Sequence, residues 1–217
     1  MADKNYRILY KGGQGELVEK KSRFIAHLFP VNSEEEAVDH INRIKKEYWD
    51  ARHNCSAFVI GDNNEISRCN DDGEPAQTAG RPMLDVLLKE NIHNCLVVVT
   101  RYFGGVLLGT GGLVRAYQGA VIEGLKQSTI LEPVEGAIGD ISTDYNGYAK
   151  IEYLLRERGF AILNTEFGAD VHIFTAVPAE SMGEIEVAIA DKTAGKAGLV
   201  WSDPIKYAFD GNELIKF

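Results

Sequence analysis

The pattern of apolar and polar residues is clearest between residues 96 and 124. Residues 96–100, LVVVT, form a short apolar run rich in β-branched side chains, which predicts a buried strand. Five glycines follow within nine residues, at Gly104, Gly105, Gly109, Gly111 and Gly112. Apolar residues then recur at spacings of three and four, as on one face of a helix, at Leu113, Tyr117, Ala120 and Val121. The pattern therefore predicts a strand, a glycine-rich loop and a helix.

The segments before this motif predict further strands and two helices. Alternation or short apolar runs typical of sheet strands occur over residues 6–20, 20–28 and 52–61. Helical spacing occurs over residues 33–48 and again from about residue 78 past residue 88. Asn32 or Ser33 can cap the first of these helices, whose early glutamates complement the helix dipole. This half of the chain is thus predicted to mix strands and helices.

A domain boundary is expected within LEPVEG, residues 131–136, where proline, glycine and charged residues occur together. The chain is therefore divided into domains at residues 1–133 and 134–217. In the second domain the pattern predicts alternating strands and helices over residues 137–145, 148–158, 160–167, 170–177, 180–191 and 198–202. This βαββαβ order is that of the ferredoxin-like module, a fold that carries many functions and implies none.

Composition is that of an ordinary globular protein. The chain has 217 residues, of which 45% are hydrophobic, so it can bury a sizeable core. No run approaches the roughly 20 apolar residues of a membrane helix, and the amino terminus has no apolar signal segment. We therefore expect a cytoplasmic protein without membrane association, whose three cysteines stay reduced.

Charge is distributed unevenly along the chain. The net charge of −9 disfavours loose, non-specific binding to nucleic acid or to an anionic membrane. Residues 1–133 carry 16 Lys and Arg against 18 Asp and Glu, a net of −2, whereas residues 134–217 carry 7 against 14, a net of −7. An anion or RNA is therefore expected to bind the first domain.

Two interpretations of the glycine-rich loop are open. The loop faces the free N–H groups of the following helix and lies between Arg101 and Arg115, so it could hold an anion. Alternatively, the glycines only allow a tight turn and close packing of the helix on a sheet. Familiar phosphate loops do not match. Thr110 stands where a P-loop needs lysine, and Val114 replaces the last glycine of a dinucleotide fingerprint.

An acidic loop precedes the second predicted helix of the first domain. Asp71, Asp72 and Glu74 lie in the sequence NDDGEPAQTAGRPML, residues 70–84. Their carboxylates could bind Mg²⁺ or act as an acid and base pair. They could equally cap the helix and accept hydrogen bonds from loop backbone, as Asp and Glu usually do in turns.

A metal site is not expected. His53, Cys55 and Cys69 are close in sequence, but a fourth ligand is missing and their spacing matches no zinc-binding pattern. Alternation places His53 on the same strand face as Cys55 and Ala57, where a hydrogen-bonded structural histidine is the commoner outcome. No cofactor and no catalytic residue is assigned.

Three segments together resemble the IMPACT/YigZ family: NDDGEP at residues 70–75, TAGRP at 78–82 and RYFGGVLLG at 101–109. They follow the family's order and spacing, and the acidic second domain looks like that of its bacterial members. The resemblance implies an amino-terminal α+β domain similar to domain IV of elongation factor G. That domain includes a left-handed crossover, which the general right-handed rule would not predict. The second, ferredoxin-like domain would be similar to domain V of the same factor.

The resemblance also implies a kind of function. Eukaryotic relatives are translation regulators that compete for a large ribosome-associated activator and so restrain a kinase of translation initiation factor 2, and some bind actin. Bacteria lack that kinase pathway. What the resemblance implies for this chain is therefore binding to the translation machinery rather than a named partner, and it singles out no catalytic residues.

Three functions remain open, and the first is favoured. It is a non-enzymatic regulatory protein that binds the ribosome, RNA or a translation-associated protein. Its expected binding residues are Arg52, His53, Arg101, Gly104, Gly105, Gly109, Gly111, Gly112 and Arg115. The second is a phosphate- or metal-dependent hydrolase or transferase that uses the glycine-rich loop and the carboxylates of Asp71, Asp72 or Glu74. The third is a scaffold whose acidic second domain docks a basic partner.

Overall fold

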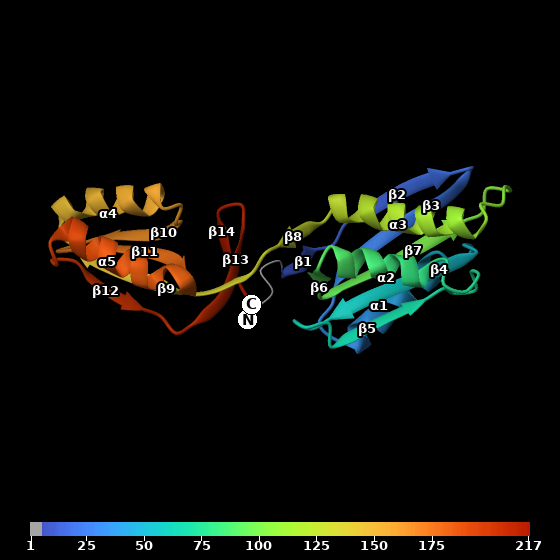
Figure 1. Ribbon diagram of the computed structural model, residues 1–217, viewed down its shortest axis with the longest axis horizontal. Helices are drawn as coiled ribbons and strands as arrows, with labels where there is room; N and C mark the ends of the chain where they lie inside the picture. Colours follow the sequence, from blue (N-terminus) through green and yellow to red (C-terminus); the bar gives the residue numbers. More distant parts are fainter. Residues whose placement is uncertain (1–5) are drawn as a thin grey trace. The chain divides into compact units, whose positions relative to one another are not determined.

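The computed structural model describes residues 6–217 (Figure 1). The chain divides into two compact units, one ending at Glu132 and one running from Pro133 to Phe217. Each unit contains both helices and strands, so the fold is of the mixed α+β class. The first five residues of the expected amino-terminal domain lie outside the described residues. Among residues 6–217, no helix combines the length and the apolar character needed to cross a membrane.

A five-stranded antiparallel sheet forms the centre of the first unit (Figure 1). Its strands lie in the order β2 (Gln14–Glu19), β3 (Ser22–Pro30), β7 (Cys95–Tyr102), β4 (His53–Ile60) and β5 (Ile66–Asn70). Every residue of β7 except Tyr102 is buried, which confirms the predicted buried strand. A smaller sheet joins β6 (Ile92–His93), β1 (Arg7–Lys11) and β8 (Thr129–Leu131).

Helices cover both faces of the five-stranded sheet. On one face α1 (Glu34–Glu47) packs against residues of β4 and β7. On the other face α2 (Gly80–Lys89) and α3 (Thr110–Lys126) pack against the alternate residues of the same strands. The largest fully buried side chains of this second face include Phe24, Leu28, Met83, Leu87 and Tyr117. The predicted helices of this half are confirmed.

Four connections meet at one end of the five-stranded sheet (Figure 1). The register sets Arg101 opposite both Phe24 and His53, and it sets Tyr102 opposite Arg23. The turn between β2 and β3, the segment before β4, the loop after β5 and the loop after β7 therefore lie at the same end. The glycine-rich loop and the acidic loop are consequently neighbours.

The second unit follows the predicted order of strands and helices. Its elements are β9 (Val134–Thr143), α4 (Tyr145–Glu157), β10 (Ile162–Phe167), β11 (Val171–Pro178), a short 3₁₀ helix (Ala179–Ser181), α5 (Met182–Thr193) and β12 (Gly198–Trp201). β9 pairs with β11 on one side. On its other side it pairs with β12 and with β13 (Ile205–Asp210), which forms a hairpin with β14 (Glu213–Lys216). That hairpin was not predicted.

The boundary between β9 and α4 differs from the prediction. The strand was expected to continue to residue 145, and the helix was expected to begin at residue 148. The Asp144 side chain accepts the Gly147 N–H at 2.7 Å and so caps the helix. Because this cap satisfies an otherwise unpaired N–H, the helix begins at Tyr145.

Candidate functional site

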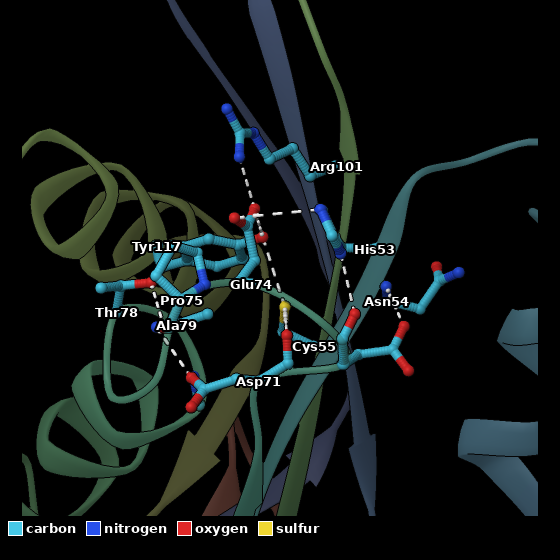
Figure 2. Close-up of polar contacts among 12 residues, drawn as sticks. His53, Asn54, Cys55, Asp71, Glu74, Pro75, Thr78, Ala79, Arg101 and Tyr117 are labelled. Atoms are coloured by element: carbon cyan, nitrogen blue, oxygen red, sulfur yellow. Dashed lines mark hydrogen bonds and ion pairs between the residues drawn. The ribbon is translucent and has the colours of Figure 1, made fainter. Parts of the chain in front are cut away.

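A buried ion pair joins the acidic loop to β7 (Figure 2). Glu74 Oε1 lies 2.5 Å from Arg101 Nη1, and the two side chains are only 3% and 7% exposed. The hydroxyl of Tyr117, on α3, donates to the same carboxylate oxygen at 2.8 Å. One carboxylate therefore connects the acidic loop, the central strand and the helix that follows the glycine-rich loop.

The surroundings of Arg101 explain why it needs this carboxylate. A buried charge loses its hydration, so its partners must supply the stabilisation that water would have given. The guanidinium carbon lies 5.3 Å from the centre of the Phe24 ring and 5.7 Å from that of Phe103. Arg101 Nε is buried and has no hydrogen-bond partner among the described residues. Glu74 is thus the carboxylate that balances the Arg101 charge.

Cys55 and His53 complete the buried network (Figure 2). The Cys55 thiol lies 3.0 Å from the Asp71 carbonyl oxygen and 3.3 Å from the Tyr117 hydroxyl. Burial raises the pKa of this thiol and also the pKa of the Tyr117 hydroxyl, so both stay protonated at neutral pH. His53 Nδ1 lies 2.8 Å from the Asp72 carbonyl oxygen and therefore carries the proton of that hydrogen bond. Its Nε2 lies 3.9 Å from Glu74 Oε2.

Asp71 stabilises the entry into α2. Its carboxylate accepts the backbone N–H groups of Gln77, Ala79 and Gly80 at 2.8, 3.0 and 2.8 Å. These donors lie at the start of the helix, where N–H groups have no partner within the helix itself. Helix capping, one of the two roles considered for the acidic loop, therefore describes the contacts of Asp71. No group of three His, Cys, Asp or Glu side chains in residues 6–217 is arranged to hold a metal ion.

Asp72 makes a pH-dependent contribution to stability. Its carboxylate accepts the Lys45 ammonium at 2.6 Å and the Asn54 N–H at 2.7 Å. Partial burial raises the pKa of this carboxyl, but the two hydrogen bonds and the Lys45 charge outweigh that effect. The pKa therefore lies below its ordinary value of 3.8. Such a group stabilises the fold above its unfolded-state pKa, and the contribution is lost as the pH falls through the lower folded-state pKa.

We therefore expect Asp72→Asn to lower the free energy of unfolding by about 1 kcal/mol at neutral pH. The difference from the wild type should shrink as the pH falls below 3.8, the ordinary pKa of the group. Urea denaturation of both proteins over a series of pH values measures this difference. A difference that stays constant down to strongly acidic pH would contradict the assignment.

Two of the expected binding arginines lie on the surface. Arg52 precedes β4, and its backbone N–H donates to the Arg101 carbonyl oxygen at 3.2 Å. Arg115 lies on α3, close to the start of the helix. Both side chains are exposed, and neither has a hydrogen bond or ion pair with any residue of 6–217. The sequence grouped Arg101 with these two arginines, but the structure separates it from them because its charge is buried and already paired with Glu74.

The structure gives three of the loop glycines, Gly104, Gly105 and Gly109, a conformational role. Gly105 has a φ of 83°, in the region that favours glycine. A Cβ atom on Gly104 would lie 2.1 Å from the carbonyl carbon of Lys21, so the loop packs directly on the turn between β2 and β3. Gly109 caps α3 with a φ of 72°, a conformation that favours glycine. Gly105 and Gly111 are exposed, and Gly112 is half-buried. These contacts support the tight-turn interpretation, and anion binding by the loop stays a prediction.

Sequence reasoning missed several residues at this end of the sheet. Tyr117 was predicted only as an apolar position of a helix, since spacing does not reveal where its hydroxyl points. The sequence also did not show that Lys21 lies beside Gly104. Trp49, which is 81% exposed, was not considered. The available signal was its position directly after the helix predicted over residues 33–48.

Comparison with known proteins covers both units of the chain. Residues 20–125 match the Impact N-terminal domain, and residues 141–196 match a domain of unknown function, DUF1949. The chain is 43% identical over 195 residues to the IMPACT family member YvyE of Bacillus subtilis, and the match covers 90% of each protein. It is 38% identical over 183 residues to the IMPACT family member YigZ of Escherichia coli, covering 83% of this chain and 90% of that protein.

A solved structure supports the same relationship. It is described as the crystal structure of a hypothetical protein, is 36% identical in sequence and has a TM-score of 0.57. The similarity covers 91% of this chain and 97% of that one. The residues of the buried network, from His53 to Tyr117, all lie inside the segment that matches the Impact N-terminal domain. Since the bacterial relatives match through both units, the chain belongs to the IMPACT family.

Proposed function

We propose that this protein is a non-enzymatic regulatory protein that binds the translation machinery through one end of its five-stranded sheet. We call this surface the basic end and define it by Lys20, Lys21, Arg52 and Arg115. All four side chains are exposed and have no hydrogen bond or ion pair within residues 6–217. This observation carries the proposal, because cations without an internal partner are available to neutralise phosphates or an acidic protein surface.

Apolar side chains are exposed beside these cations. Leu107, in the glycine-rich loop, is 83% exposed, and its neighbour Val106 is also exposed. Exposing apolar side chains to water is unfavourable, and a group of them next to charged residues is typical of a macromolecular contact. The loop therefore has the chemical character of a binding surface as well as the geometry of a turn.

Family membership supports the class of partner. The Protein IMPACT homolog of Dictyostelium discoideum is 43% identical to this chain over 97 residues, which are 28% of that protein. The family resemblance implies that eukaryotic members regulate translation. We extend to this chain only binding to the ribosome, to RNA or to a translation-associated protein, in the cytoplasm.

The proposal includes a fold assignment for each domain. Residues 1–133 would form a domain similar to domain IV of elongation factor G, and residues 134–217 a ferredoxin-like domain similar to its domain V. In the second unit the strands lie in the order β10, β11, β9 and β12, with helices α4 and α5 between consecutive strands of the chain. This arrangement supports the ferredoxin-like assignment.

The enzyme alternative has less support from the geometry. Asp71, Asp72 and Glu74 each accept at least two hydrogen bonds or ion pairs from groups of the protein itself. These contacts hold each carboxylate in place, and a metal ion or a substrate proton would have to compete with them. The contacts instead support a structural role for the acidic loop, which holds the glycine-rich loop and the basic end in place.

Reversing the exposed charges tests the proposal. We expect the double variant Arg52→Glu, Arg115→Glu to bind ribosomes at least about tenfold more weakly than the wild type at low salt, with a reduced dependence on salt. Co-sedimentation over a series of salt concentrations measures both effects.

The matched control is Lys89→Glu, Lys126→Glu, which makes the same change in net charge at the far ends of α2 and α3. The control should bind like the wild type. Equal loss of binding in both variants would indicate a general charge effect and contradict the assignment. The proposal would be contradicted if the wild-type protein bound neither ribosomes nor structured RNA at low salt.

A further inference from the structure

We infer that the basic end binds unpaired RNA bases by stacking them on Trp49 and Phe103. The inference rests on the proposed function, because stacking alone does not distinguish RNA from single-stranded DNA. Trp49 is 81% exposed and Phe103 is 42% exposed. Each of these exposed rings offers a face to a ligand, and aromatic faces beside cations are the combination that binds single-stranded nucleic acid.

Both rings lie at the same end of the five-stranded sheet as the four cations that define the basic end. Trp49 follows α1 on one face of the sheet, and Phe103 follows β7 on the side of Arg101 and α3. Hydrogen bonds connect the two segments that carry the rings. The Tyr102 hydroxyl donates to the Asp50 carboxylate at 2.8 Å, and the Arg52 N–H donates to the Arg101 carbonyl oxygen. The two rings therefore lie at the same end of the sheet, on opposite faces. Arg52 lies between Trp49 and the start of β4 in the chain.

The buried network gives Phe103 a defined position. Its ring contacts the Arg101 guanidinium, and the guanidinium is held by Glu74. A ring that is already ordered loses little conformational entropy when a base stacks on it. The ion pair of Glu74 and Arg101 therefore acts as a positioning element for the surface, although neither charge is exposed.

The combination of rings and cations favours unpaired RNA over a duplex. Every base has a π face, and a single strand can offer its bases to aromatic side chains while its phosphates meet lysine and arginine. In an A-form duplex the faces of the bases are stacked on each other and are not available to protein rings. An acidic protein surface could pair with the cations and pack on the rings, and the test below separates that outcome from base stacking.

Fluorescence of Trp49 provides a direct test in the full-length chain. The protein has two tryptophans, so Trp201→Phe leaves Trp49 as the only tryptophan, whose emission can be excited selectively. We expect a short single-stranded RNA of mixed sequence to quench this emission on binding, and a blunt-ended RNA duplex of equal length to bind more weakly without quenching. Trp49→Ala should weaken single-strand binding about tenfold, whereas Trp49→Phe, which keeps an aromatic ring, should stay close to the wild type.

A control variant and the charge-reversal variant together separate this inference from the proposed function. Tyr153→Ala removes an exposed aromatic ring from the second unit and should leave RNA binding unchanged. Equal binding of duplex and single strand, or unchanged affinity of Trp49→Ala, would overturn the stacking assignment. In either case a loss of ribosome binding in Arg52→Glu, Arg115→Glu would still support the proposed function. Ribosome binding without any binding of single-stranded RNA would overturn the inference and leave structured RNA or a protein as the partner. A protein that binds neither ribosomes nor single-stranded RNA would contradict both proposals.

Discussion

Replacing Glu74 with alanine is expected to lower the free energy of unfolding of the first unit by about 3–5 kcal/mol. The reason is that Arg101 would remain buried without its carboxylate, since its side chain is only 7% exposed. The Tyr117 hydroxyl would lose its acceptor at the same time. Urea unfolding followed through the NMR signals of β7 residues measures this effect, because these residues report on the first unit alone.

Two variants separate the buried charge from the loss of side-chain contacts. Glu123→Ala breaks an exposed ion pair with Lys126 in the same unit, and we expect a cost of at most about 0.5 kcal/mol. The double variant Glu74→Leu, Arg101→Met removes both buried charges. It should recover most of the stability lost in Glu74→Ala, because no uncompensated charge remains. If Glu74→Ala cost no more than Glu123→Ala, the ion pair would not have the structural role assigned to it.

Gly104→Ala is expected to destabilise the first unit by about 3 kcal/mol. The added methyl group would lie 2.1 Å from the carbonyl carbon and 2.3 Å from the carbonyl oxygen of Lys21. These are backbone atoms, so the clash cannot be relieved by rotating a side chain. Either the loop after β7 or the turn between β2 and β3 would have to move. Thermal and urea denaturation measure the loss of stability.

The matched control for this substitution is Gly111→Ala in the first turn of α3. Its Cβ would meet only Arg115 Nη1, at an ordinary contact distance of 3.6 Å. Alanine has a higher helix propensity than glycine, so we expect stability to be unchanged or to rise by up to about 1 kcal/mol. Similar losses in the two variants would show that the close packing at Gly104 is not what makes glycine necessary there.

Local features of the sequence were sufficient to predict most elements. The first helix depends on a cap and on residues three and four apart. Ser33 accepts the Glu36 N–H at 3.1 Å, as one of the two predicted capping residues. The strand, glycine-rich loop and helix between residues 96 and 124 were also predicted from local patterns, because the residues that indicate each element lie close together in the sequence. The short strands β5, β6 and β8 were not predicted. Nor was the hairpin of β13 and β14, where Gly211-Asn212 between two short strands was an overlooked turn signal.

The candidate site could be predicted only in part. The two loops that build it were recognised, and so were His53, Glu74 and Arg101 as residues of interest. The sequence did not show that Glu74 and Arg101, which are 27 positions apart, form one buried pair, or that Tyr117 joins them from 43 positions away. Nor did it show that Arg52 and Arg115 remain exposed.

By itself, the sequence determined the order of most elements, the family, the glycine-rich loop and the acidic loop, since these depend on spacing and on short motifs. Only the tertiary structure decided which charges are buried and which face water. The physical reason is that the energy of a charge depends on its surroundings in three dimensions. Arg101 and Arg115 have the same chemistry and lie on either side of the same loop. One is enclosed by two aromatic rings and a carboxylate, and the other is left exposed for a partner.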